Sequence, residues 1–426
     1  NDILEKFVIK RSNIKKNIFY AQSGGVTPVI NATARGIYDA YLRNKKIFGK
    51  LYVGKNGIAG ALNEDLIDIE TEKKSEIMKL IHTPGGAFGS CRIKLKDPRK
   101  NQSEFKKIFD VFQAHNIGYF LYNGGGDSQD TTLKLSKFFR ENKLDIKCIG
   151  IPKTIDNDLP ETYSCPGFGT VAKYIATSTL EASLDVSSMS NSSTKVFLLE
   201  VMGRHAGWLA ASSGVIKGLN NNAPHIILFP EIAFDKSKFL KKVKKSVDDD
   251  GFCVIVSSEG IKDKKGDFIS STKTKDSFGH SHLGGVAPVL ARMITGSLNI
   301  KVHWAVADYL QRASRHIGSK ADVEQAYIVG EESIKLLKKN ISDVMVTIKR
   351  SATGKKWRVG SVKLEKVANT EKKLPKNFIT KDGFSITRKC KEYINEMILG
   401  EDIPPFKKGL PDYAKLQLKL TKKILK

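Results

Sequence analysis

Short apolar runs that end in glycine or small polar residues recur through the first half of the chain. Each run is followed by a segment whose apolar positions have helical spacing. Three such pairs occupy residues 17–25 and 29–43, 117–128 and 131–142, and 147–158 and 171–188. This alternation is typical of βα units, so consecutive strands are expected to lie parallel with helices on both faces of a sheet. Ligands bind at the carboxyl ends of such strands, and the polar motifs of this chain fall there.

A second series of strand-like and helical segments predicts another α/β lobe. These segments occupy residues 195–207, 225–230, 236–247 and 251–260. From about residue 340 the pattern changes to alternating, strand-like sequence at 344–350 and 356–368, followed by a polar helical tail.

The composition describes a globular chain with a large positive charge. Of the 426 residues 40% are hydrophobic and 27% are charged, which excludes a disordered tail and a collagen-like fibre. The 71 Lys and Arg against 45 Asp and Glu give a net charge of +26, which fits nucleic-acid binding or an enzyme for phosphorylated substrates. Because 58 of these cations are Lys and 13 are Arg, we attribute most of the charge to a solvated surface.

The chain lacks the signals of a membrane, disulfide-rich or zinc protein. No stretch approaches the roughly 20 apolar residues of a membrane helix. The five cysteines are widely spaced and never form CxxC. We therefore expect a cytoplasmic protein with no membrane partner.

Three glycine-rich loops follow predicted strands and are candidates for an anion site. They are residues 23–25, residues 82–92 with Arg92, and residues 122–130 with Asp127. Bare backbone amides at a helix N-terminus can hold phosphate. The spacing matches neither GxGxxG nor GxxxxGKS, so a Rossmann dinucleotide site and a P-loop are disfavoured. Together the loops predict a polyphosphate cradle, the alternative being that the glycines only make tight turns.

Two carboxylates stand close together in the segment PKTIDNDLP, just past a predicted strand. Asp156 and Asp158 flank Asn157, and Lys153 and Thr154 come immediately before. Phosphoryl transfer to an alcohol needs a carboxylate that takes the proton of the hydroxyl, and cations that hold the charge of the transferring group. The segment supplies both, but the residues alone do not rank the two carboxylates.

A set of motifs, taken in order, resembles the phosphofructokinase family. They are SGG, GGAFGSCR, GGGDS, PKTIDND, EVMGRHAGWLA, FPE and YLQR. The later segments KLPKNFI and KGLPDYAKL resemble more loosely the C-terminal region of the pyrophosphate-dependent members. The resemblance implies an α/β fold of two Rossmann-like three-layer α/β/α lobes, with the active site in the cleft between them and a C-terminal extension. We expect a phosphoryl-donor lobe at 16–165 and 312–355, a fructose 6-phosphate lobe at 166–311 and the extension at 356–426.

The resemblance also assigns roles in the sugar site. Asp156 matches the general base that deprotonates the 1-hydroxyl of fructose 6-phosphate, Asp158 the second carboxylate and Thr154 a threonine beside the transferring group. Glu231 is expected to accept hydrogen bonds from sugar hydroxyls. The other expected sugar-site residues are Lys195, Met202, Gly203, Arg204, Lys301, His303, Tyr309 and Arg312.

Three of these positions depart from the family's usual residue. Lys195 and His303 stand where the family has arginine, and Tyr309 stands where many members have histidine. Lysine keeps the charge but loses the bidentate fork of arginine, and neutral histidine keeps only hydrogen bonding. Lys195 and His303 would complete a neighbour's sugar site, so the resemblance implies a homodimer or homotetramer with shared sites.

The donor site is expected to bind pyrophosphate together with Mg²⁺. ATP-dependent members generally read GGDGS and GTIDND, where this chain reads GGGDS and KTIDND. Asp127 would bring bulk and negative charge to the place of the α-phosphate of ATP, and Lys153 would bring a cation, so a short, highly charged donor is favoured. The expected donor-binding residues are Gly24, Gly25, Arg92, Gly125, Gly126, Asp127, Ser128 and Lys153. Gly126 replaces the aspartate usually credited with holding Mg²⁺, so Asp127 and Asp156 are the candidate metal ligands.

The main hypothesis is reversible phosphoryl transfer from pyrophosphate to the 1-hydroxyl of fructose 6-phosphate, a glycolytic reaction with Asp156, Lys153 and Arg204 as catalytic residues. The runner-up is the ATP-dependent version of this enzyme. A nucleic-acid-binding protein is a remote alternative, because no RNP, KH or zinc-finger signature is present. Retention of Asp156, Asp158, Arg204 and Arg312 argues against a catalytically silent relative.

Overall fold

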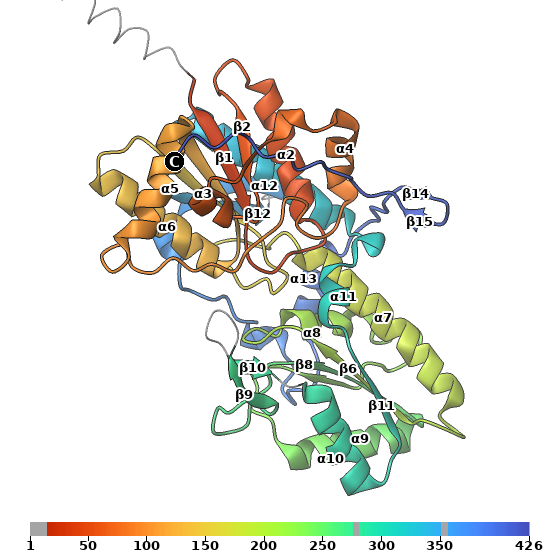
Figure 1. Cartoon of the computed structure of the whole chain (residues 1–426). Coiled ribbons are helices and arrows are strands. Elements are labelled where there is room, and N and C mark those ends of the chain that lie inside the picture. The colour runs from red at the N-terminus through yellow and green to blue at the C-terminus, as the bar shows by residue number, and fades with distance from the viewer. Residues whose placement is uncertain (1–14, 276–280, 284, 351–356, 426) are drawn as a thin grey trace, which may run out of the picture.

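The computed structural model describes residues 15–275, 281–283, 285–350 and 357–425. They form two α/β lobes, which lie one above the other in Figure 1. In this part of the chain no helix is both long and apolar enough to cross a membrane.

A seven-stranded sheet forms the centre of the first lobe. Its strand order is β13-β12-β5-β4-β1-β2-β3, and neighbours are parallel except for the edge pairs β2 with β3 and β12 with β13. The strands are β1 (Asn17–Gln22), β2 (Leu51–Gly54), β3 (Leu66–Asp68), β4 (Ile117–Gly124), β5 (Lys147–Pro152), β12 (Val344–Arg350) and β13 (Trp357–Lys363). The three predicted βα units are confirmed, because β1, β4 and β5 each lead into a helix.

Helices cover both faces of this sheet. They are α2 (Ile30–Arg43), α3 (Ala59–Asn63), α5 (Gln102–Ala114), α6 (Gly126–Glu141) and α12 (Lys320–Lys338). Ile18 and Tyr20 of β1 pack against α2 and α12, whereas Phe19 and Ala21 pack against α3, α5 and α6. Successive side chains of a strand point to opposite faces, so a strand that is apolar throughout has a helical layer on each side.

The second lobe is built on the parallel sheet β11-β6-β8-β7. Its strands and the helices around them are β6 (Val196–Val201), β7 (Ile226–Leu228), β8 (Cys253–Ser258), β11 (Val302–Val306), α7 (Phe168–Met189), α8 (Trp208–Ser212), α9 (Lys236–Asp250) and α10 (Val286–Leu298). Leu199 and Val201 of β6 pack against α7 and α8, and Val196 and Leu198 pack against α9 and α10. The predicted second α/β lobe is therefore confirmed.

Short elements complete the described chain. They are α4 (Lys74–Lys79), α11 (Asp308–Arg312), α13 (Arg388–Met397), β9 (Ser271–Lys275), β10 (Ser281–Leu283), β14 (Phe406–Lys407), β15 (Leu410–Pro411) and the 3₁₀ turns η1 (Ile69–Thr71), η2 (Leu80–His82), η3 (Ser213–Ile216), η4 (Arg315–Ile317), η5 (Leu364–Lys366) and η6 (Lys376–Phe378).

The C-terminal part of the chain contacts both lobes rather than forming a separate unit. β13 pairs with β12 along its whole length, so the first sheet continues beyond residue 355, where we expected it to end. The boundary at 355/356 itself lies outside the described residues. α13 packs against α7 and α8 of the second lobe, and Glu72 of the first lobe accepts hydrogen bonds from the amides of Gln417 and Leu418.

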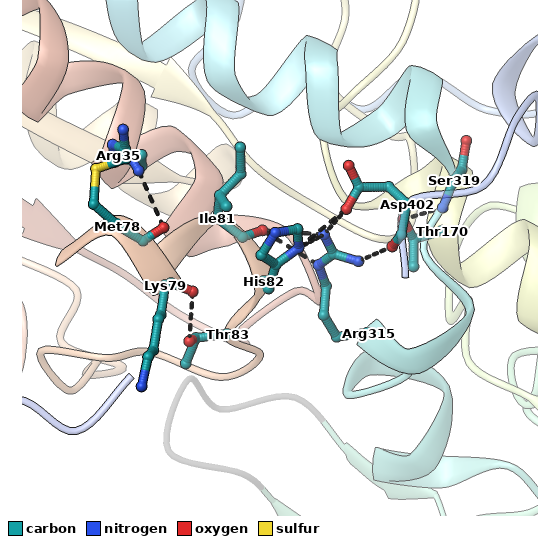
Figure 2. Close-up of polar contacts among 10 residues, drawn as sticks. All are labelled: Arg35, Met78, Lys79, Ile81, His82, Thr83, Thr170, Arg315, Ser319 and Asp402. Carbon is teal, nitrogen blue, oxygen red and sulfur yellow. Dashed lines mark hydrogen bonds and ion pairs between the residues drawn. The ribbon is translucent and has the colours of Figure 1, made fainter. Parts of the chain in front are cut away.

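A fully buried arginine ties three distant segments together next to the cleft (Figure 2). The guanidinium of Arg315 donates to the carbonyl of Ile81, to Nδ1 of His82, and to both the carbonyl and the carboxylate of Asp402. Its five donors are therefore shared among a first-lobe loop and the C-terminal segment. Arg315 begins η4, three residues after the end of α11 at Arg312.

Candidate active site

A cavity of about 1220 Å³ lies where the carboxyl ends of the two sheets face each other. Its lining comes from the loops after β1, β4 and β5 of the first lobe and after β6, β8 and β11 of the second. β1 and β4 are neighbours, but the helices that follow them lie on opposite faces of the sheet. Such a reversal opens a crevice at the strand ends, which is where doubly wound sheets bind ligands.

Three cations converge on the glycine loop after β1. Lys153 Nζ donates to the carbonyl of Gly25 over 2.5 Å. A Cβ atom placed on Gly25 would lie 3.1 Å from Nη1 of Arg312 and 3.2 Å from Nη2 of Arg92. A side chain at Gly25 would therefore push into the two guanidinium groups, whereas glycine leaves them side by side at a bare backbone. The arrangement concentrates positive charge at one end of the cavity.

The loop after β4 supplies the start of a helix to the same end of the cavity. α6 begins at Gly126, so its first backbone amides and the positive end of its dipole face the cavity. Ser128 Oγ donates to Ser23 Oγ over 2.8 Å and joins this loop to the first. A Cβ atom on Gly124 would lie 2.1 Å from Ser128 Oγ, so only glycine allows this approach. The structure thus brings the glycine loops together.

The environment of Lys153 in the folded protein disfavours its charged form. Only 4% of the residue is exposed. Burial, followed by the nearby charges of Arg92 and Arg312, lowers the pKa of Lys153 from 10.5 to about 7. An anion bound beside Lys153 would oppose this effect, because it would favour the charged form of the lysine.

The two carboxylates after β5 are presented to the cavity by the residue between them. Asn157 has φ +52°, a left-handed conformation that asparagine tolerates better than most residues. Its Nδ2 donates to the hydroxyl of Tyr393 over 2.8 Å, and its Oδ1 accepts from the amide of Cys165 over 3.0 Å. Asn157 therefore anchors the turn to the protein while Asp156 and Asp158 line the cavity.

Burial gives both carboxylates unusual basicity. The pKa of Asp156 is raised by burial first and by the charge of Asp158 second. Burial also raises the pKa of Asp158. Within the described residues Asp158 Oδ1 is buried and has no hydrogen-bond partner. A buried carboxylate with a raised pKa is the kind of group that serves as a general base.

The model of the phosphofructokinase family matches residues 17–337. The chain belongs to the phosphofructokinase family.

Among the relatives are proteins named pyrophosphate–fructose 6-phosphate 1-phosphotransferase. That of Halomonas elongata is 53% identical over 401 residues, which cover 94% of this chain and 96% of the relative. That of Methylococcus capsulatus is 51% identical over 402 residues, with 94% and 96% covered. A solved structure of the pyrophosphate-dependent phosphofructokinase from Nitrosospira multiformis has a TM-score of 0.90 and 53% identity, covering 96% of this chain and 99% of that chain. The expected fold is confirmed.

In this phosphofructokinase family member, most of the expected site residues line the cavity. On the donor side they are Gly24, Gly25, Arg92, Gly125, Gly126, Asp127, Ser128 and Lys153. The expected sugar-site residues among them are Thr154, Asp156, Asp158, Met202, Arg204, Tyr309 and Arg312. Of these, Arg312 lies beside Gly25 with the donor-side cations rather than apart from them. The Arg312 guanidinium lies 3.8 Å from the centre of the Tyr309 ring, so the tyrosine that replaces the family's usual histidine supports this arginine from one face.

Five expected sugar-site residues do not line the cavity. Glu231 instead accepts hydrogen bonds from the amides of Gly207 and Leu374, both at 2.9 Å. Gly203 has φ +120° and does not line the cavity, although its chain neighbours Met202 and Arg204 do. The other three are Lys195, Lys301 and His303.

These last three lie toward the far end of the second sheet. Lys195 and Lys301 directly precede β6 and β11, and His303 is the second residue of β11. Strands of five or six residues separate the two lysines from the cavity by roughly 17–20 Å, at about 3.3 Å for each residue. β11 is an edge strand of its sheet and β6 is its inner neighbour, and none of the three residues lines the cavity of its own chain.

Other cavity residues were missed by the sequence reasoning. They are Lys94, Glu200, His205, Glu259, Asp308 and the segment of residues 369–373. The segment is held in place because the amide of Lys372 donates to the carbonyl of Asp158 over 2.6 Å and Trp208 Nε1 donates to the carbonyl of Lys372 over 3.1 Å. The segment adjoins KLPKNFI, but it is far along the chain from the loops that carry the glycines and the carboxylates, so the sequence did not place it in the site. Lys94 follows Arg92 by two residues and could have been noticed.

The carboxylates suit a magnesium ion only in part. The described residues contain no group of three or more His, Cys, Asp and Glu placed to hold a metal. Mg²⁺ usually takes one or two carboxylates and completes its shell with water and substrate phosphates. Asp156 and Asp158 can provide such an anchor because both line the cavity and Asp158 has an unpartnered oxygen. Asp127 is less available as a metal ligand, because its Oδ1 lies 2.6 Å from Lys94 Nζ.

Proposed function

We propose that this chain transfers a phosphoryl group reversibly between pyrophosphate and the 1-hydroxyl of fructose 6-phosphate, with fructose 1,6-bisphosphate and phosphate as products. The observation that carries the proposal is the convergence of Lys153, Arg92 and Arg312 on Gly25 at the helix end of the cavity. A compact cluster of cations fits a short polyanion. Relatives about half identical to this chain bear the name of this activity.

In the proposed reaction Asp156 removes the proton of the 1-hydroxyl. Its raised pKa makes it a better proton acceptor than an ordinary aspartate. Lys153, Arg92 and Arg312 bind the donor, and Arg204 on the opposite wall stabilises charge that grows on the transferring group. When bound, Mg²⁺ would neutralise phosphate charge, with Asp158 as its holder on the protein and Asp156 left free to act as the base.

Turnover with pyrophosphate compared with ATP tests the proposal. The purified protein, fructose 6-phosphate and Mg²⁺ are mixed with each donor, and fructose 1,6-bisphosphate is measured. The reverse reaction is followed as phosphate consumption. We expect activity with pyrophosphate in both directions and little with ATP. Strong turnover of ATP without turnover of pyrophosphate would establish the alternative, an ATP-dependent enzyme.

We further propose a homo-oligomer in which Lys195 and His303 complete the neighbour's sugar site. Lys195 directly precedes β6 and His303 lies in the edge strand β11, both toward the end of the sheet that is remote from the cavity, and this position supports the proposal. Mixing inactive Lys195→Met and Asp156→Asn variants should restore activity, because a mixed pair contains one intact site. No recovery after demonstrated subunit exchange would show that sites are not shared.

A cytoplasmic location is also part of the proposal. It is supported by five free cysteines, four of which are buried. Cell fractionation with an activity assay tests it, and activity confined to the membrane or external fraction would contradict it.

A further inference from the structure

Lys94 forms an ion pair with the carboxylate that stands in the donor half of the cavity. Its Nζ lies 2.6 Å from Asp127 Oδ1, and both residues line the cavity. The side chains are 44% and 36% exposed, so both remain accessible to a ligand. The hydrogen bond to Asp127 raises the pKa of Lys94, which therefore stays charged at neutral pH.

Asp127 poses an electrostatic problem for a pyrophosphate site. It lies in the first turn of α6, beside the loop on which Lys153, Arg92 and Arg312 converge. A bare carboxylate at this place would repel a donor that carries several negative charges. The chain therefore needs a cation that neutralises Asp127 without taking the place of the donor.

The neighbouring carboxylate of the same helix is neutralised in the same way. Asp130 is buried, and its Oδ2 lies 2.6 Å from Lys134 Nζ while its Oδ1 accepts from Asn369 over 2.9 Å. Asp127 and Asp130, the two acidic residues near the start of α6, thus each form an ion pair with a different lysine. Lys94 comes from a different loop, so its pairing with Asp127 also connects the Arg92 loop to the start of α6.

We propose that Lys94 is a positioning residue that sets donor specificity, by pairing with Asp127 so that this carboxylate tolerates a short polyanion. This inference rests on the proposed function. Asp127 disfavours a nucleotide by its bulk, and Lys94 removes the charge penalty that Asp127 would otherwise impose on pyrophosphate. The pair of Lys94 and Asp127 therefore excludes ATP while allowing pyrophosphate to bind.

The first test compares Lys94→Met, Lys94→Arg and a matched control. Lys94→Met should raise KM for pyrophosphate about tenfold, with kcat and KM for fructose 6-phosphate within about twofold of the parent. Lys94→Arg keeps the charge and should retain most of the affinity. Lys137→Met breaks a similarly exposed pair with Glu365 and should change neither constant. A normal KM for pyrophosphate in Lys94→Met would overturn the proposal.

The second test asks whether Lys94 acts through Asp127. Asp127→Asn removes the charge that Lys94 neutralises, so adding Lys94→Met to it should cost less than about threefold in pyrophosphate affinity. Calorimetric binding of pyrophosphate to the same variants, without the sugar, gives a readout that is independent of turnover. An undiminished tenfold loss in the Asp127→Asn background would mean that Lys94 binds the donor directly and would overturn the pairing. Failure of the parent protein to use pyrophosphate would instead refute the proposed function.

Discussion

Replacing Lys153 with methionine should stabilise the ligand-free protein while abolishing its use of pyrophosphate. Lys153 is 4% exposed, and its pKa is lowered from 10.5 to about 7 by burial and by Arg92 and Arg312. At 1.36 kcal/mol for each pH unit, this difference corresponds to roughly 5 kcal/mol of unfavourable free energy for the charged form. The hydrogen bond to Gly25, worth about 1 kcal/mol, is lost in the variant, so the gain is at most about 4 kcal/mol.

The stabilisation by Lys153→Met should depend on pH, and the direction follows from the pKa of Lys153 in the folded and unfolded chain. The folded pKa of Lys153 lies below the unfolded value, so the unfolded chain binds more protons between about pH 7 and pH 10.5 and stability rises with pH there. Below about pH 7 the lysine is charged in both states and the penalty is complete. The advantage of Lys153→Met should therefore be largest near pH 6 and should vanish near pH 10.

Thermal unfolding at these two pH values provides the assay. For a lobe of this size Tm changes by about 2–4 °C per kcal/mol, so a rise of several degrees is expected near pH 6. Lys147→Met is the matched control, since Lys147 begins the same strand but is 26% exposed and paired with Asp145. An unchanged or lower Tm near pH 6, or a gain that is equal at both pH values, would refute the reasoning.

Three further changes test the site. Asp156→Asn should lower kcat about 10²–10⁴-fold by removing the general base, and calorimetry should find pyrophosphate affinity within about threefold of the parent; a smaller loss of kcat would assign the base elsewhere. Asp127→Gly combined with Lys153→Gly should gain some ATP-dependent turnover. An unchanged donor preference would show that these positions do not determine the choice between pyrophosphate and ATP. Asn157→Ala should lower the free energy of unfolding by about 1–3 kcal/mol and should also lower kcat, because the turn loses its hydrogen bonds to Tyr393 and Cys165. Thermal unfolding and steady-state kinetics check this, and a variant with the stability and kcat of the parent would contradict it.

The alternation of strands and helices was enough to predict the site's location. The loops after β1, β4 and β5 carry the glycines, Lys153 and the carboxylates, and the carboxyl ends of parallel strands necessarily meet at one edge of a sheet. The family motifs then ranked Asp156 above Asp158, which the residue pattern alone could not do. Local periodicity and short motifs were therefore sufficient for the fold class and for most of the cavity.

The tertiary structure decided what depends on contacts between distant segments. The lowered pKa of Lys153 comes from burial, from Arg92 and from Arg312, which lies at the end of α11, far along the chain. Residues 369–371 and 373 line the cavity, and the amide of the next residue, Leu374, donates to Glu231, which does not reach the site expected for it. The pairing of Lys94 with Asp127 likewise joins two loops. Hydrophobic periodicity encodes which face of an element is buried, but not which charged side chains meet once the elements have packed.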